Sequence, residues 1–259
     1  MDSPSQNLHL TCMRIQERHR QRQDLQSAEV RLTLQLKSIC RRFTQGHKDE
    51  ARALYASIEN AGTHPLADKL RASVAPLLLA REALRAPRKL LEREMERDVR
   101  MLPIWPRVAA TKGLGALGVA SIIGETGDLS NYSSHSKLWK RLGLAVIGGE
   151  RQRRVHGAAA IAHGFSPCRR AIVWQVGSSL FRAQSERRDP HTGKVVREAG
   201  TYRLGYDARK SHERPRVASA AHAHNRATRY MEKKLVRNIW LAWRHAAPRP
   251  PLPAKTTKH

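Results

Sequence analysis

The chain has 259 residues, of which 48 are Lys or Arg and 22 are Asp or Glu, so its formal net charge at pH 7 is +26. Residues 1–100 contain 19 basic and 13 acidic side chains, whereas residues 101–259 contain 29 and 9. Like charges at this density repel one another unless a polyanion neutralises them, so we expect a nucleic acid as partner. The aromatic content of 5% argues against a large all-β sandwich.

Membrane insertion, disulfides and metal binding are not indicated by the sequence. The first 20 residues have no apolar core of the kind that a secretory signal has, and the longest apolar run, Val74–Ala80, is too short to span a bilayer. Three widely spaced cysteines, Cys12, Cys40 and Cys168, argue against a disulfide framework. The sequence contains no CxxC pair that would indicate a zinc site. We therefore expect a cytoplasmic protein without a cofactor or a bound metal.

Residues 1–102 are expected to form a helical, coiled-coil arm. From about residue 14 to residue 43, apolar side chains recur on one helical face, and a second stripe from about 87 to 102 predicts an antiparallel partner. Such helices either pack only on each other or join two copies into a homodimer, because sustained apolar stripes also make coiled coils.

Between these stripes, residues 48–80 are expected to form two shorter helices separated by the sequence GTHP at 62–65. Pro76 and Pro87 are expected to break or kink the helices in which they occur, because proline has no N–H to donate and its ring clashes with the preceding turn.

Residues 103–246 are expected to form a helix-hairpin-helix-type domain. The sequence TKGLG at 111–115 precedes an apolar helix. One glycine on each side of an apolar residue allows a tight turn. Gly113 and Gly115 would let backbone amides face a phosphate, with Lys112 adding a charge. Alternatively, these glycines only allow close packing of helices.

Two helix starts follow. Ser133 or Ser134 can cap a helix that ends near Leu142, and Ser166-Pro167 is a strong start signal for the next one. The second helix carries two arginines in its first turn, which oppose the helix dipole and so favour an anionic ligand nearby. The nucleic-acid-binding residues expected from the sequence are Lys112, Gly113, Gly115, Arg151, Arg153, Arg154, Arg169 and Arg170.

The last third of the domain contains a basic insertion and a closing helix. Turn residues and alternating apolar residues at 185–217 would permit a β-hairpin, although a mobile basic excursion is the favoured interpretation. Apolar residues at four-residue steps predict a helix at 218–246, and the composition of 247–259 is typical of disorder. The expected fold is therefore mainly α, with a small β-hairpin insertion left open.

Three segments after residue 102 share, in order, a set of features with one family. The features are Gly113 to Gly115, Gly118 to Gly124, Glu125 with Gly127-Asp128, Ser133-Ser134, Gly143-Leu144, Gly164 with Arg169 and Arg170, and His224 with Lys234-Leu235 and Trp240. In this order they resemble the C-terminal transposase domain of the insertion-sequence 110/116/902 transposase family, and the arm resembles the coiled-coil linker of that family. The resemblance implies DNA transposition or recombination guided by a structured RNA, so DNA and RNA are both expected ligands.

Two departures from the family pattern bear on catalysis. The resemblance implies an N-terminal RNase H-like domain with metal-binding carboxylates, which the matched region does not include. It also implies a nucleophilic serine in a Ser-Gly step, where this chain has Gly148-Gly149. No Ser, Thr or Cys occurs between Ser136 and Ser166, and glycine offers no atom that can attack phosphorus. We therefore assign no catalytic residue and expect a truncated or catalytically impaired member.

Two other hypotheses remain open. The second makes the chain a non-enzymatic nucleic-acid-binding or regulatory protein derived from such a transposase. A third makes it an active enzyme with Ser133, Ser134 or Ser166 as a substitute nucleophile, although helix capping explains these serines more simply.

Overall fold

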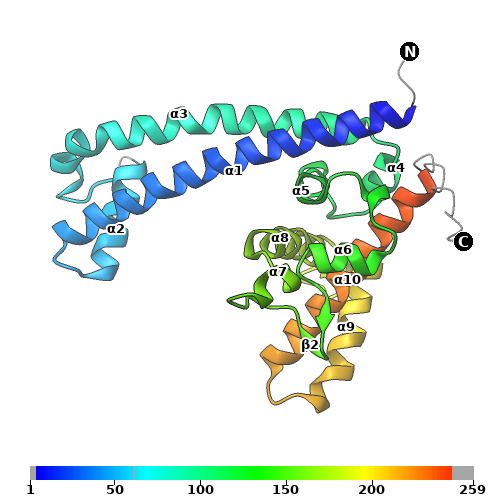
Figure 1. The fold of residues 1–259 in the computed structure, drawn as a ribbon. Coiled ribbons are helices and arrows are strands. Elements are labelled where there is room, and N and C mark those ends of the chain that lie inside the picture. The colour runs from blue at the N-terminus through cyan, green and yellow to red at the C-terminus, as the bar shows by residue number, and fades with distance from the viewer. Residues whose placement is uncertain (1–3, 61, 247–259) are drawn as a thin grey trace, which may run out of the picture. The chain divides into compact units, whose positions relative to one another are not determined.

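The computed structural model describes residues 4–60 and 62–246, and these are mainly α-helical with two small antiparallel β-hairpins (Figure 1). This confirms the expected fold class. The chain forms two compact units, one from residues 18–94 and one from the residues before 18 together with those from 95 onward. The tail at 247–259, expected to be disordered, lies outside the described residues.

The two units do not divide at residue 102, where the sequence predicts the domain boundary. The hydrophobic core of the larger unit includes residues from both ends of the arm, namely Leu8, Cys12, Ile15, Met95, Val99 and Leu102. The composition changes at Pro103 because helix α3 (Ala67–Arg100) has just ended. The residues of α3 begin to pack in the core of the larger unit at Met95, about two helical turns earlier. The sequence marks the end of the helix, not the change of core.

The smaller unit contains parts of two long helices and one complete shorter helix. Their bounds are α1, Pro4–Phe43; α2, Lys48–Asn60; and α3, Ala67–Arg100. Arg22 Nε lies 2.8 Å from Glu92 Oε1, and Arg85 Nε lies 3.0 Å from Glu29 Oε1. Since the partner number falls as the α1 number rises, α1 and α3 are antiparallel, as the apolar stripes predict (Figure 1).

Of the break or kink expected at the two prolines, a break is excluded, because α3 runs through Pro76 and Pro87. Each proline leaves the carbonyl four residues earlier without its helical partner. Both prolines and the residues at those carbonyls, Ala72 and Ala83, are exposed, so water can satisfy the carbonyls. The second of the two short helices expected within 48–80 is therefore the first part of α3.

A compact apolar cluster holds the three helices of the smaller unit together. Its buried members are Leu36, Cys40, Ala51, Leu54, Ile58, Ala67, Leu70 and Val74. Burial of each large apolar side chain stabilises the unit by about 1.5–3 kcal/mol. Beyond this cluster, nearer to residues 22 and 92, ion pairs join α1 to α3.

The larger unit contains the remaining elements. They are α4, Trp105–Ala109; α5, Ala116–Thr126; η1, Leu129–Asn131; α6, His135–Arg141; β1, Val146–Ile147; β2, Glu150–Arg151; α7, Ala159–His163; α8, Pro167–Ala183; β3, Arg187–Arg188; β4, Val195–Arg197; α9, Thr201–Glu213; η2, Arg214–Arg216; and α10, Ala220–Ala246. Helix α10 packs against α6, α8 and α9, and α5 packs on α8. The core lies between these helices and includes Trp243, whose Nε1 donates to Asp128 Oδ1 at 3.1 Å.

The expected helix starts are confirmed. Ser134 caps α6 by accepting from the backbone N–H of Lys137, and Ser166 caps α8 by accepting from that of Arg169. Leu138, in the middle of α6, is completely buried.

The expected mobile excursion at 185–217 is replaced by ordered elements. Strands β3 and β4 form a hairpin, which is the alternative that the turn residues permit, and helix α9 follows. Tyr206 of α9 is buried against Ala227 and Met231 of α10, and its hydroxyl lies 2.6 Å from His224 Nδ1. Packing on α10 thus stabilises a helix whose own sequence signal is weak.

Among the described residues, none of the helices combines the length and the apolar composition that crossing a lipid bilayer requires.

Candidate nucleic-acid interface

The turn between α4 and α5 adopts the tight geometry that its glycines predict, but it is packed against α8. The Leu114 amide donates to the Thr111 carbonyl at 3.0 Å, and Gly113 has φ +87°. A Cβ on Gly113 would lie 2.7 Å from Ala183 Cβ and 2.9 Å from Leu180 Cα. The geometry therefore supports the packing role of Gly113 that the sequence left open.

Gln184, at the end of α8, fixes this turn. Its side-chain Nε2 donates to the Lys112 carbonyl at 2.9 Å, and its Oε1 accepts from the Tyr202 amide at 3.0 Å. The Lys112 side chain stays exposed, and a Cβ on Gly115 would meet no atom within 4 Å. Gln184 thus joins the turn to the start of α9, and the approach to the turn is open at Lys112 and Gly115.

The two arginines in the first turn of α8 are both paired with carboxylates. Arg169 Nε lies 3.1 Å from Glu125 Oε2, while Arg170 makes two bonds to Glu232, at 3.1 and 2.7 Å. Glu232 is completely buried. Burial raises the pKa of Glu232, and the guanidinium of Arg170 opposes that rise. The anionic group that the sequence predicts beside Arg170 is, in the structure, a carboxylate of the protein itself.

A hollow of about 250 Å³ lies between α6 and the start of α8, and cationic residues line most of it. Its lining residues are Lys137, Lys140, Arg141, Gly164 and Arg169. Within the described part of the chain, Lys137, Lys140 and Arg141 have no carboxylate within ion-pair distance. Arg141 Nε instead donates to the Glu125 carbonyl at 3.0 Å. Most of the positive charge around this hollow is therefore available to an anion.

Gln152 holds the arginine-rich segment beside this hollow. It is 2% exposed, and its Nε2 donates to the carbonyls of Lys140 and His163 at 3.1 and 2.8 Å. Its Oε1 accepts from the Ala145 amide at 3.2 Å. These bonds tie the β1–β2 hairpin to the last turns of α6 and α7, which Figure 1 shows close together.

The arginines on either side of Gln152 are exposed. Arg151 pairs with Val146 in the hairpin, and Arg154 follows it along the chain. Arg153 lies 3.1 Å from Glu150, but both side chains are more than 60% exposed, so this ion pair is weak. Together with the hollow they form what we call the α6–α8 surface, which consists of Lys137, Lys140, Arg141, Arg151, Arg153, Arg154 and Arg169.

Further cations behind the α6–α8 surface add to its positive potential. Arg229 Nη2 donates to the carbonyls of Gly143 and Ala145, both at 3.1 Å. Burial lowers the pKa of Arg229, the charges of Arg170 and Arg151 lower it further, and the carboxylate of Glu232 offsets only part of this effect. Burial and the charge of Arg229 also lower the pKa of Lys233. Like charges are thus crowded here, and a bound anion would relieve their repulsion.

The structure separates the predicted binding residues into two groups. Gly113 contacts the C-terminal end of α8, whereas Arg169 belongs to its first turn. At 1.5 Å per residue, the helix between residues 169 and 183 is about 21 Å long. The α4–α5 turn and the α6–α8 surface are therefore different places on this unit.

Four residues of this site are not among those expected from the sequence, namely Lys137, Lys140, Arg141 and Gln152. A signal exists for the first three, because positions 137, 140 and 141 have the three- and four-residue spacing that places side chains on one helical face. Nothing in the sequence marks Gln152, whose partners come from three separate segments.

The comparisons with known proteins give no match: no protein-family model, no curated protein and no solved structure is significantly similar to this chain.

Proposed function

We propose that this chain is a DNA-binding protein of the insertion-sequence 110/116/902 transposase type, which holds nucleic acid through the phosphate backbone at the α6–α8 surface. The observation that carries the proposal is the hollow around Lys137, Lys140 and Arg141, cations without a carboxylate partner in the described structure. Phosphate groups are the anions that such a cluster binds in nucleic acids, and these contacts supply most of the non-specific affinity.

The family resemblance extends the proposal to the ligand. Relatives of this type act on DNA with a structured RNA, so duplex DNA and a folded RNA are both proposed ligands. Contacts of this kind fix the position of the backbone and carry no base sequence. We therefore propose binding that depends on charge and shape more than on sequence.

We further propose a binding role without strand-transfer chemistry, because of how the serines are used. The hydroxyls of Ser134 and Ser166 accept hydrogen bonds from the backbone at the starts of α6 and α8. Gly148 and Gly149, at the place of the expected Ser-Gly step, both have positive φ and form the β1–β2 turn. These roles favour the second candidate function, a non-enzymatic nucleic-acid-binding or regulatory protein.

The test is direct binding to a labelled duplex and to a folded RNA hairpin at low salt. A variant with Lys137, Lys140 and Arg141 all changed to Gln should bind both more weakly. The matched control changes Lys194, Arg214 and Arg237 to Gln, which removes the same charge from exposed positions of the same unit. Equal weakening in both variants would show that net charge alone is at work and would remove the α6–α8 surface from the proposal.

The same preparation tests the catalytic part. Incubated with supercoiled plasmid and Mg²⁺, the protein should leave the plasmid intact. Nicked or protein-linked product that disappears in Ser134→Ala or Ser166→Ala would contradict the proposal and assign the chain an active substitute nucleophile.

A further inference from the structure

A second hollow lined by cations lies in the smaller unit, at the corner between α1 and α2. It has a volume of about 440 Å³, and its lining residues are Lys37, Arg41, Lys48, Ala51, Arg52 and Tyr55. Four of these six residues are cationic. Neither charge counting nor the transposase resemblance points to this corner.

The helical repeat explains why these residues meet. Lys37 and Arg41 are four apart on α1, and Lys48, Arg52 and Tyr55 share one face of α2, so each helix contributes a single side. The turn between the helices brings the two sides together. Gly46, at φ +88°, donates its amide to the Arg41 carbonyl at 2.9 Å, which ends α1 and reverses the chain.

The charges in this hollow are not balanced by the protein. Among the described residues, Lys37, Arg41 and Lys48 have no carboxylate within 4 Å. Arg52 lies 3.9 Å from Asp49, with both side chains more than 80% exposed, which gives the pair little strength.

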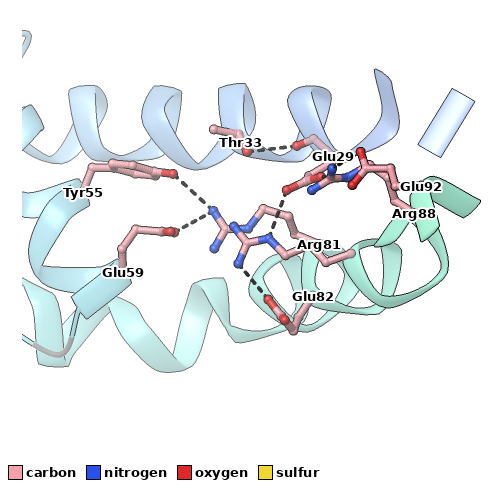
Figure 2. Close-up of polar contacts among 9 residues, drawn as sticks. Glu29, Thr33, Tyr55, Glu59, Arg81, Glu82, Arg88 and Glu92 are labelled. Atoms are coloured by element: carbon pink, nitrogen blue, oxygen red, sulfur yellow. Dashed lines mark hydrogen bonds and ion pairs between the residues drawn. The ribbon is translucent and has the colours of Figure 1, made fainter. Parts of the chain in front are cut away.

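Other arginines of the same unit form ion pairs with carboxylates of neighbouring helices, as Figure 2 shows for Arg81 and Arg88. Arg81 is 5% exposed and lies 2.6 Å from Glu59 Oε1. Arg85 and Arg88 both pair with Glu29, at 3.0 and 3.1 Å. The carboxylates of these pairs thus neutralise arginines that join the helices of the unit, whereas the cations at the hollow have no such half-buried partner among the described residues.

One wall of the hollow is fixed by this ion-pair network. The Tyr55 hydroxyl accepts a hydrogen bond from Arg81 Nη1 at 3.2 Å (Figure 2), and Lys37 Nζ lies 5.3 Å from the centre of the Tyr55 ring. Burial, reinforced by the charge of Glu59, raises the pKa of Tyr55, so the ring stays neutral beside the cations. The hollow therefore has a fixed aromatic wall and exposed cationic side chains around it.

We propose that this corner of the smaller unit is a second binding site for the phosphate groups of a nucleic-acid backbone, formed by Lys37, Arg41, Lys48 and Arg52. The four cations match two or more phosphates, and the Tyr55 ring closes one side of the hollow. The site does not depend on the α6–α8 surface, because its residues belong to the other unit. It makes the arm a nucleic-acid-binding element as well as a helical connection.

The first experiment is lysine footprinting of the full chain with and without a saturating labelled duplex or RNA hairpin. Acetylation of Lys37 and Lys48 should slow several-fold when nucleic acid is bound. Lys69 and Lys89, which are exposed on α3 of the same unit, should react at unchanged rates. Equal rates at Lys37 and Lys48 with and without bound nucleic acid would overturn the proposal.

The second experiment uses two variants of the full chain. One changes Lys37, Arg41 and Arg52 to Gln; the control changes the exposed Arg31, Lys69 and Arg93 of the same unit to Gln. All are helical positions, and glutamine is a good helix former, so both variants should keep the far-ultraviolet circular dichroism of the wild type. The first variant should lower the magnitude of the log–log salt slope by about 0.9 for each duplex phosphate that it no longer neutralises, and the control should not.

The outcomes separate this proposal from the proposed function. If only the Lys137, Lys140 and Arg141 variant weakens binding, the arm site is wrong and the proposed function stands. If only the Lys37, Arg41 and Arg52 variant does, the arm site stands and the α6–α8 surface is wrong. Binding of the full chain to anionic-lipid vesicles but not to nucleic acid would assign the corner to a membrane surface and overturn the proposal.

Discussion

Arg170 of α8 and Glu232 of α10 form an ion pair with two hydrogen bonds, at 3.1 and 2.7 Å, in which the carboxylate is completely buried. A Cβ on Gly177 would lie 2.9 Å from Glu232 Cγ, so the two helices approach closely at this pair. The pair belongs to the framework behind the α6–α8 surface. Arg170 therefore maintains the fold, in contrast to the exposed arginines of the α6–α8 surface, which are open to a ligand.

Changing Arg170 to Gln should destabilise the protein by about 3–5 kcal/mol, because it leaves a buried carboxylate without its partner. Arg153→Gln, at an exposed pair, should change the free energy of unfolding by less than about 0.5 kcal/mol. Urea unfolding followed by circular dichroism measures both. A stable Arg170→Gln protein that no longer binds DNA would show instead that Arg170 contacts the ligand, as the sequence suggests.

Gly113→Ala should destabilise the protein by more than about 1 kcal/mol, because a side chain at φ +87° is strained and its Cβ would overlap with α8. The matched change is Gly115→Ser, at an N-cap with open space, which should alter stability by only a few tenths of a kcal/mol. Thermal unfolding of the two variants provides the measurement. Equal melting temperatures would mean that the turn is not packed on α8 as described.

Cys168 offers a direct probe of the α6–α8 surface, because it is exposed in the first turn of α8 beside Arg169. Cys12 is buried, and burial raises its pKa to about 12, so it stays a protonated and unreactive thiol. Cys40 is buried as well. A maleimide should therefore label Cys168 selectively, and saturating duplex DNA should slow this reaction. A labelling rate that DNA leaves unchanged would place the ligand elsewhere, and Cys168→Ser checks the assignment of the label.

The ion pairs of the smaller unit predict a loss of stability in acid. Burial raises the pKa of Glu29, but the hydrogen bond from Arg85 and the charges of Arg88 and Arg85 outweigh it, so the pKa is lowered overall. A carboxyl whose pKa is lower in the folded state stabilises the fold at pH values above its pKa in the unfolded state, which for Glu is about 4.3. That contribution is lost as the pH falls from there through the folded pKa.

The Glu29→Gln variant should consequently be less stable than the wild type at pH 7. At a pH below the folded-state pKa of Glu29, the two proteins should have nearly equal free energies of unfolding. Urea titrations at pH 7 and at successively lower pH measure the difference. A gap between the two proteins that widens as the pH falls would contradict the assignment.

Local signals in the sequence predict much of this fold. Ser134 and Ser166 cap the helices that they are expected to cap, and the apolar stripes predict the antiparallel pairing of α1 with α3. The helix caps depend on residues within one or two turns, and the apolar stripes on a spacing of side chains that the sequence shows directly. The continuity of α3 through its two prolines could not be predicted, because the cost of a proline in a helix depends on solvent exposure, which the sequence does not show.

The candidate site was harder to predict, because it depends on distant partners. Arg170 looks like any basic residue at a helix start until Glu232, 62 residues further along the chain, is placed against it. Gln152 acquires its role from carbonyls at the ends of two helices. Lys137, Lys140 and Arg141 were detectable from their spacing, but only the structure shows that they surround a hollow with Arg169.

The central claim is that Lys137, Lys140 and Arg141 hold the phosphate backbone, and the salt dependence of DNA affinity tests it most directly. Binding of a labelled B-form duplex should be measured from low to moderate salt for the wild type and for the variant with all three changed to Gln. We predict a linear log–log plot whose slope is less steep in the variant by about 0.9 for each phosphate that is no longer neutralised, which is about 2.7 if each residue neutralises one phosphate. Identical slopes, with the variant fully folded, would contradict the claim.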